Sequence, residues 1–210
     1  MEWHSTDAQS LASIDREIGS HVFPPAEYEI VRRVVYATAD FDYKSLISFS
    51  ERALEYGAAA ISTRQAILVD VTVVKAGIVR NIQKTFINQI YCAYDSITSI
   101  DIEQNKKNKT TPALGIEILA KRYPQGIFVI GESQTALNTL VDLIESKIIQ
   151  PSLVIATPPE FASIESKKQQ LQKLAIPHII TTSNKGNSAI AIAIIDALID
   201  LAWQVYGKIS

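Results

Sequence analysis

The sequence predicts an α/β fold in which a mainly parallel sheet is covered by helices on both faces, in a single domain that spans residues 1–210. Short apolar runs, typical of strands buried on both faces, alternate with segments whose apolar residues recur at helical spacing. Parallel strands need long crossover connections, and the intervening helices supply them. With 47% hydrophobic and 20% charged residues, the chain has enough apolar material for one well-buried core.

The amino-terminal part predicts three helices before the first strand. The first covers residues 7–18 and carries Leu11 and Ile18 on one face. A pair of prolines opens the second helix, which ends near Tyr36, and Ser50 is expected to cap a third helix that runs to about Ser62. The apolar run that follows predicts a buried strand ending on the carboxylate of Asp70.

The rest of the chain alternates regularly between helices and strands. A polar tract over residues 101–110 predicts a loop. The further strands are expected at residues 87–93, 126–130, 152–156 and 177–181. The further helices are expected at residues 71–77, 112–121, 133–146, 164–174 and 187–205.

Composition narrows the function classes. The net charge is −2 with both signs interspersed, so no basic face is available to bind nucleic acid, and the lysine run at residues 106–109 is interpreted as a solvated loop. A single Cys92 excludes an internal disulfide and a multi-cysteine metal site. The three histidines are scattered, His178 is interpreted as a structural imidazole in a strand, and we expect no metal site. No apolar signal segment comes first, which indicates a cytoplasmic protein.

The most apolar segment, residues 188–203, predicts a buried helix and no membrane span. Asp196 and Asp200 interrupt it at four-residue spacing, whereas a span needs about 20 apolar residues. Two carboxylates on one helical stripe indicate a solvated polar edge. The alternative interpretation is an acid pair for catalysis.

The stretch around Tyr36 is the first candidate site. Tyr36 stands at the end of an apolar helical run, directly before the short polar residues Thr38 and Asp40. A phenol beside such a tip can meet a ligand. It can equally be a packed tyrosine whose hydroxyl has a structural partner.

In an α/β fold, ligands bind at the carboxyl ends of the strands and at the helix N-termini that follow. Four junctions qualify here: residues 70–72, 131–135, 157–161 and 182–188. The last offers an anion the free amides of a turn entering a helix, the cation of Lys185 and the hydroxyl of Ser188. Ordinary turn chemistry explains the same residues. The sequence contains no dinucleotide-binding, phosphate-loop, zinc-protease or serine-hydrolase signature.

These segments together resemble the precorrin-8X methylmutase family over nearly the whole chain. The matching pieces, in order, are SLASIDRE, RRVVYATADFD, the strand ending at Asp70 followed by VVKAGI, GESQTAL, PPEFASIESK and KGNSAIA. The resemblance implies an α/β domain without a cofactor, working as a homodimer with active sites near the subunit interface. It also implies a reaction, the shift of one methyl group between adjacent carbons of a corrinoid to give hydrogenobyrinate or its cobalt counterpart.

The resemblance implies a site as well. Tyr36 takes the place of the family's usual histidine, the expected proton donor, although an unperturbed tyrosine has a pKa near 10 against about 6.5 for histidine. The expected substrate-binding residues are Ser10, Thr38, Asp40, Asp70, Lys75, Ser133, Lys185, Gly186, Asn187 and Ser188.

The chain also departs from the family pattern. Thr111 and Pro112 stand where an arginine and a serine are usual, Glu160 replaces a glycine, and an arginine expected before Lys185 is absent. Other cations that compensate for these arginines would be Arg33, Arg64, Lys75, Arg80 and Lys185. Three hypotheses follow: a working methylmutase, a homologue that binds a tetrapyrrole without isomerising it, and an interaction protein that uses the dimeric scaffold alone. Retained small and polar residues in the expected site loops favour the first.

Overall fold

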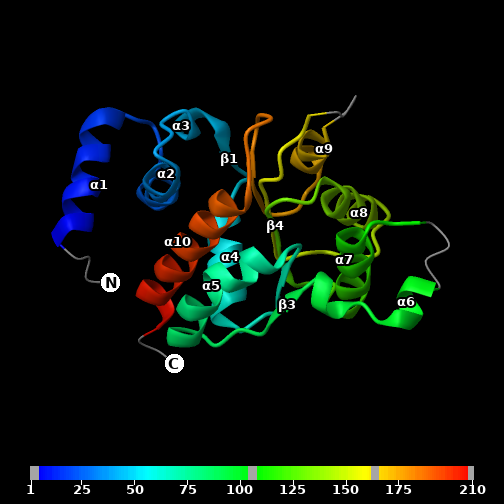
Figure 1. The fold of residues 1–210 in the computed structure, drawn as a ribbon. Coiled ribbons are helices and arrows are strands. Elements are labelled where there is room, and N and C mark those ends of the chain that lie inside the picture. The colour runs from blue at the N-terminus through cyan, green and yellow to red at the C-terminus, as the bar shows by residue number, and fades with distance from the viewer. Residues whose placement is uncertain (1–4, 104–107, 162–165, 208–210) are drawn as a thin grey trace.

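The computed structural model describes residues 5–103, 108–161 and 166–207, and its strands form one six-stranded sheet in the order β1-β6-β5-β4-β2-β3 (Figure 1). β1 pairs antiparallel with β6, and the other neighbouring strands are parallel. The predicted α/β class with a mainly parallel sheet is therefore confirmed. The strands are β1 Ile47–Phe49, β2 Ile67–Val69, β3 Ile90–Cys92, β4 Ile127–Ile130, β5 Leu153–Ala156 and β6 His178–Thr181.

Helices cover both faces of the sheet, as the sequence predicts. α2, α4, α5 and α10 lie on one face, α7, α8 and α9 lie on the other, and α1 packs against α2 outside the first layer (Figure 1). The helices are α1 Ser5–Ile18, α2 Pro25–Thr38, α3 Tyr43–Leu46, α4 Ala53–Ser62, α5 Thr72–Lys84, α6 Ser99–Glu103, α7 Thr111–Arg122, α8 Gln134–Glu145, α9 Lys167–Lys173 and α10 Ser188–Tyr206, with a short 3₁₀ helix η1 at Tyr94–Ser96.

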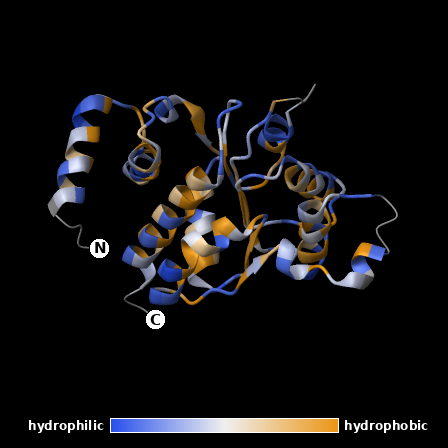
Figure 2. Cartoon of the chain, viewed as in Figure 1, coloured by the Kyte–Doolittle hydropathy of each residue, from blue (hydrophilic) through white to orange (hydrophobic). Residues whose placement is uncertain are grey.

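The alternation of strand side chains builds two cores. Ile67 and Val69 of β2 face the α10 layer, and Leu68 between them faces the α7–α8 layer. The same alternation holds in β4 and β5, so these strands read as continuous apolar runs. Figure 2 accordingly shows hydrophobic colour concentrated between sheet and helices, and hydrophilic colour on the outer helix faces.

Several boundaries differ from those predicted. β1 and α3 occupy residues for which the sequence predicted no element, and Ser50 caps no helix, because α4 begins only after Arg52. Ser50 instead accepts a hydrogen bond from the backbone of His178. α5 continues to Lys84, since Ile78 and Ile82 extend its buried stripe. α6 lies in the predicted loop, while residues 104–107 and the expected helix start at 164 fall outside the described residues.

α10 has no solvated acidic edge, so that prediction is wrong. Arg33 of α2 donates to Asp200 at 2.6 Å, and Asn81 of α5 donates to Asp196 and Asp200 at 3.1 and 3.2 Å. The two carboxylates face neighbouring helices, and burial together with the charge of Asp200 raises the pKa of Asp196. α10 is long and apolar enough to cross a membrane, but it is a core helix, with 61% of its most apolar window buried.

Candidate functional site

The four predicted junctions meet at the carboxyl edge of the parallel sheet. The loops that follow β6, β5, β4 and β2 are neighbours because these strands are neighbours in the sheet. Backbone and side-chain hydrogen bonds connect them: Thr157 donates its amide to Ile130 and its hydroxyl to the carbonyl of Asn187, at 2.9 and 3.0 Å. Residues that are far apart in the sequence therefore lie side by side along this edge of the sheet.

Tyr36 lies on the last turn of α2, and its side chain is exposed. Its hydroxyl donates to Asp7 of α1 at 2.9 Å, and this hydrogen bond is the main cause that raises the pKa of Tyr36 above its ordinary value. Tyr36 is thus a weaker acid here than an isolated tyrosine. Ser10 lies one turn beyond Asp7 on α1 and donates to the carbonyl of Thr6, so a role in binding substrate stays a prediction.

The turn after α2 connects to Lys185. The Thr38 hydroxyl donates to the carbonyl of Val34 and accepts from the amide of Asp40, while Ala39 between them adopts a left-handed conformation with φ 53°. Lys185 donates to Asp40 and Asp42, each at 2.7 Å. These contacts lower the pKa of Asp40 and raise that of Lys185. The structure therefore brings together the predicted residues Thr38, Asp40 and Lys185.

The Asp70 carboxylate faces the backbone of the loop after β4, and its expected role in substrate binding stays a prediction. Its carboxylate is fully buried and accepts three backbone N–H groups, from Gly131, Glu132 and Ser133, at 3.0, 2.8 and 2.7 Å. Burial raises the pKa of Asp70, and the three hydrogen bonds oppose that effect. Asp70 fixes the loop after β4, and Ser133 then caps α8 by accepting from Ala136 at 3.1 Å.

Several groups of the turn before α10 have partners inside the protein. Asn187 caps α10 by accepting from Ala189 and Ile190 at 2.9 and 3.2 Å, so these two amides of the first helical turn are not free. Ser188 donates to Glu132 at 3.0 Å, which joins the turn to the loop after β4. Gly186 is required by packing, since a Cβ there would lie 2.1 Å from the carbonyl oxygen of Thr157.

A cavity of about 650 Å³ opens at this edge, beside the loop after β4. Its residues come from the starts of α5, α7 and α8 and from η1: Val71, Thr72, Val73, Tyr94, Thr110, Pro112, Glu132, Ser133 and Thr135. The Thr110 and Thr135 hydroxyls lie 2.6 Å apart. Lys75 belongs to the same side and is held by Asp95 at 2.8 Å. Hydroxyls, a carboxylate and apolar side chains line the cavity, so it suits a partly apolar ligand with polar substituents.

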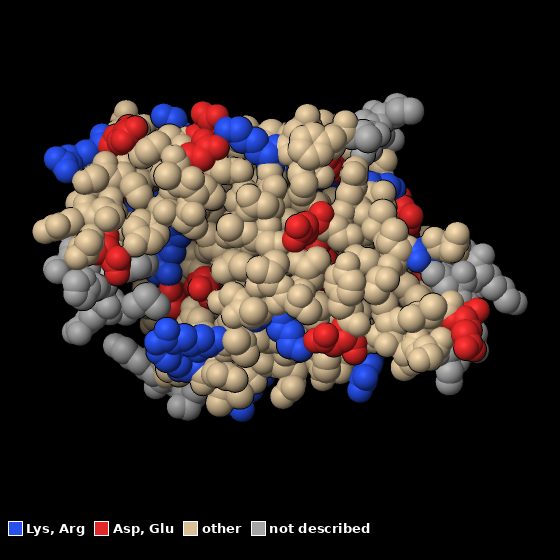
Figure 3. Space-filling model, viewed as in Figure 1, with Lys and Arg blue, Asp and Glu red and all other residues tan. Residues whose placement is uncertain are grey.

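The cations that the sequence suggests as substitutes are distributed unevenly. Lys75 and Lys185 lie at the carboxyl edge, and their side chains are 38% and 46% exposed. Arg33 is largely buried between Glu29 and Asp200. Arg64 follows α4 and precedes β2, at the opposite edge of the sheet. Figure 3 shows positive and negative side chains intermixed along the margins of the visible face, while an acidic cluster lies near its middle, surrounded by uncharged residues.

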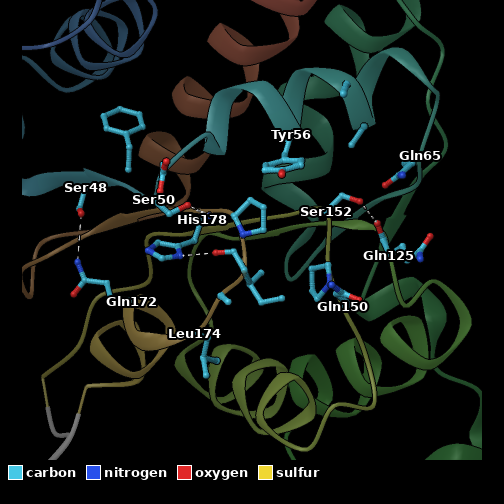
Figure 4. Close-up of a pocket in the computed structure, with 18 of the residues that line it drawn as sticks. Ser48, Ser50, Tyr56, Gln65, Gln125, Gln150, Ser152, Gln172, Leu174 and His178 are labelled. Carbon is cyan, nitrogen blue, oxygen red and sulfur yellow. Dashed lines mark hydrogen bonds between the residues drawn. The ribbon is translucent and has the colours of Figure 1, made fainter.

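A second, larger cavity of about 990 Å³ lies at the amino ends of β5 and β6 and contains none of the predicted binding residues. Neutral amides and hydroxyls surround it, and Figure 4 shows Gln65, Gln125 and Gln150 on one side and Gln172 bonded to Ser48 on the other. The buried His178 bonds through Nδ1 to the carbonyl of Ile176 at 2.8 Å, which confirms its structural role. Among the described residues, no group of three or more potential ligands is arranged to hold a metal ion.

Sequence reasoning missed the acidic partners at this edge. Asp7, Asp42, Asp95 and Glu132 each hold a predicted residue through a side-chain contact. Asp42 and Glu132 lie inside the matching segments RRVVYATADFD and GESQTAL, which was a usable signal. Asp7 and Asp95 lie outside these segments, and only the tertiary structure reveals them.

The family model, the curated relatives and the solved structures that match this chain all point to the same family. The precorrin-8X methylmutase family model matches residues 6–201. Curated relatives include the cobalt-precorrin-8 methylmutases of Synechocystis sp. (36% identical, covering 96% of this chain and 97% of the relative) and Leptospira interrogans (34%, covering 92% and 91%). The crystal structure of precorrin-8X methylmutase from Thermus thermophilus matches with a TM-score of 0.84 at 30% identity, covering 96% and 99% of the two chains. The chain therefore belongs to the precorrin-8X methylmutase family, the isomerases of corrin biosynthesis.

Proposed function

We propose that this isomerase moves one methyl group between adjacent carbons of a carboxylate-bearing corrinoid at the carboxyl edge of its sheet. The step is intramolecular: one carbon–carbon bond breaks, one forms, and no electron donor or acceptor is consumed. The proposed site, named the rim below, consists of Tyr36, Thr38, Asp40, Glu132, Ser133, Lys185 and Ser188.

The observation that carries this proposal is the continuity of the rim. Lys185 joins the turn after α2 to the turn before α10, through Asp40 at 2.7 Å. Ser188 then joins that turn to the loop after β4, through Glu132 at 3.0 Å. Three segments that match the family are thus in direct contact, at the edge where α/β folds bind ligands.

Exposed aromatic rings support a large, flat ligand at this edge. Tyr36 lies on the last turn of α2, Tyr94 follows β3 and Phe161 lies in the loop after β5, and all three are exposed. Aromatic faces pack favourably on a conjugated macrocycle. The ammonium groups of Lys75 and Lys185 are accessible, and we propose that substrate carboxylates replace their aspartate partners when the corrinoid binds.

Tyr36 is proposed to donate a hydrogen bond to the macrocycle and to leave Asp7 when it does so. Its raised pKa makes full proton transfer unfavourable at neutral pH, whereas hydrogen-bond donation remains available. A hydrogen bond contributes about 1.4 kcal/mol or roughly tenfold in rate, while a lost general acid costs roughly a hundredfold or more.

The test is single-turnover absorbance on precorrin-8X and cobalt-precorrin-8. Tyr36→Phe should lower the rate roughly tenfold and keep product affinity, because the ring is retained. Tyr36→His should restore or exceed the original rate, since imidazole has the better-matched pKa. Tyr56→Phe is the control, because Tyr56 is another exposed tyrosine but lines the cavity at the opposite edge.

Three results would count against the proposal. Equal rates for wild type and Tyr36→Phe would exclude a role for the hydroxyl. A loss of a hundredfold or more would identify Tyr36 as a general acid. No turnover by the wild type, with turnover gained in Tyr36→His, would indicate a binding protein derived from an enzyme.

Three finer properties belong to the same proposal. We expect the cobalt-containing substrate to react faster, because the relatives at 36% and 34% identity carry that name. We also expect a homodimer, as the family resemblance implies, and light scattering should give about twice the chain mass of 23.2 kDa. We also expect a cytoplasmic location, since α10, which is long and apolar enough to cross a membrane, is a core helix here.

A further inference from the structure

Lys168 places an amino group, which is ordinarily charged, in an almost completely buried position. It lies in α9 and is 2% exposed. Its ammonium group donates to the Pro158 carbonyl, the Thr181 hydroxyl and the Ser183 carbonyl, at 3.1, 3.2 and 2.8 Å. A lysine ammonium has three N–H groups, so these three acceptors use its full donor capacity.

The three acceptors belong to two neighbouring segments at the carboxyl edge. Pro158 lies in the loop after β5, and Thr181 and Ser183 lie at the end of β6 and beyond it. Lys168 therefore connects the loop after β5, which leads to α9, with the loop after β6, which leads to α10. Burial lowers the pKa of Lys168 and the charge of Glu160 opposes this effect. Burying such a cation is costly unless it is paired and hydrogen-bonded, as it is here.

Glu160 completes this buried cluster. One carboxylate oxygen lies 3.8 Å from the Lys168 ammonium and accepts from the Ser166 hydroxyl. The other oxygen is buried and has no hydrogen-bond partner within the described part of the chain. The acidic half of the cluster is itself buried, since Glu160 is 6% exposed.

The cluster acts on the rim through the residues next to it. The Ser183 hydroxyl accepts from the Lys185 amide at 3.0 Å, and Thr157, directly before Pro158, donates its hydroxyl to the Asn187 carbonyl at 3.0 Å. The turn at residues 183–187, which is the loop after β6, is thus held at its start by Lys168 and at its end by the loop after β5. The ammonium of Lys185 reaches Asp40 only if this turn keeps its position.

We propose that Lys168 is a positioning residue for corrinoid binding, because it fixes the loops after β5 and β6 and thereby places Lys185. This role rests on the proposed function at the rim. It requires no contact between Lys168 and the substrate. It predicts that loss of the ammonium changes substrate affinity more than the rate of the chemical step.

The experiment compares Lys168→Met with Lys167→Met. Lys167 precedes Lys168 on α9, and its ammonium group donates to the exposed Asp142 of α8 at 2.7 Å. At a temperature where circular dichroism shows both variants folded, KM, kcat and the affinity for the corrinoid product are measured. Amide hydrogen exchange is followed across residues 182–191 in the same samples.

For Lys168→Met we expect KM and the product Kd to rise at least tenfold, kcat to change less than threefold, and amides of residues 182–187 to exchange at least tenfold faster. Lys167→Met should match wild type within about twofold. The double variant Lys168→Met/Glu160→Gln removes the unpaired buried carboxylate, so it should regain stability but not affinity. If the single variant does not fold, the same measurements are made on the double variant.

Wild-type KM and exchange rates in the folded Lys168 variants would overturn the proposal. So would recovery of affinity in the double variant, because the single variant's defect would then come from the unpaired Glu160 alone. If wild type neither binds nor converts a corrinoid, the proposed function fails. The exchange rates of the turn still decide whether Lys168 fixes its position.

Discussion

Replacing Gly186 by alanine tests whether the turn before α10 must touch the loop after β5. The new Cβ would lie 2.1 Å from the Thr157 carbonyl oxygen and 2.9 Å from its carbon. Ordinary contact begins at 3.4 Å, so one of the two backbones must move by about 1.3 Å. Thr157 cannot yield easily, because its amide and hydroxyl are both bonded, to Ile130 and Asn187. Overpacking of this kind typically costs about 1–3 kcal/mol.

Gly57→Ala is the matched control. Its Cβ would approach side-chain methyl groups of Leu153 and Leu198 at 2.8 Å, and these can rotate away. Alanine in a helix interior also gains up to about 1 kcal/mol over glycine, which offsets the crowding.

The assay combines urea unfolding with absorbance titration of the corrinoid product. Gly186→Ala should lose about 1–3 kcal/mol of unfolding free energy and bind at least tenfold more weakly, because Lys185 moves with the turn. Gly57→Ala should stay within about 1 kcal/mol of wild type and bind normally. Wild-type stability and affinity in Gly186→Ala would refute the close contact and its link to binding.

Two further predictions concern stability. Asp196 has a raised pKa in the folded protein, so the folded state binds its proton more tightly than the unfolded state, and stability from this group falls as pH rises above about 4. Asp196→Asn should therefore be more stable than wild type at pH 7, with the difference shrinking towards pH 4 in urea unfolding; a difference independent of pH would contradict this. Ala39→Gly should stabilise by about 0.5–1 kcal/mol, since Ala39 has φ 53° and glycine adopts that conformation without strain; a destabilised variant would argue against strain at this turn.

The sequence was sufficient for the elements whose signal is local. The runs in β4 and β5 are apolar throughout because both faces are buried, and this pattern is visible without a structure. β1 was missed because its three residues gain their strand conformation from pairing with β6, more than a hundred residues later. Short strands of this kind carry too little periodicity to be recognised.

The candidate site was predictable in location but not in its internal contacts. Strand ends and helix starts indicated the edge at which the structure brings these loops together, since parallel strands end together. The partners of Lys185 are 143 and 145 residues away, and no local pattern identifies them. Lys168 looked like any other lysine of a polar helix, and only its burial distinguishes it. The three backbone partners of Asp70 could not be foreseen either, because the direction of a carboxylate at a strand end depends on the neighbouring loop.

Asp70 has a consequence for how this protein handles charge. Its carboxylate already occupies the three amides at residues 131–133, a cluster of the kind that holds a ligand's anion in other α/β proteins. Lys185 likewise starts out paired with two aspartates. Under the proposed function, a substrate carboxylate would therefore have to replace a carboxylate partner that the protein already supplies. Added salt weakens the old pairs as well as the new ones. Corrinoid affinity should accordingly fall less steeply with ionic strength than the number of lysines at this edge suggests.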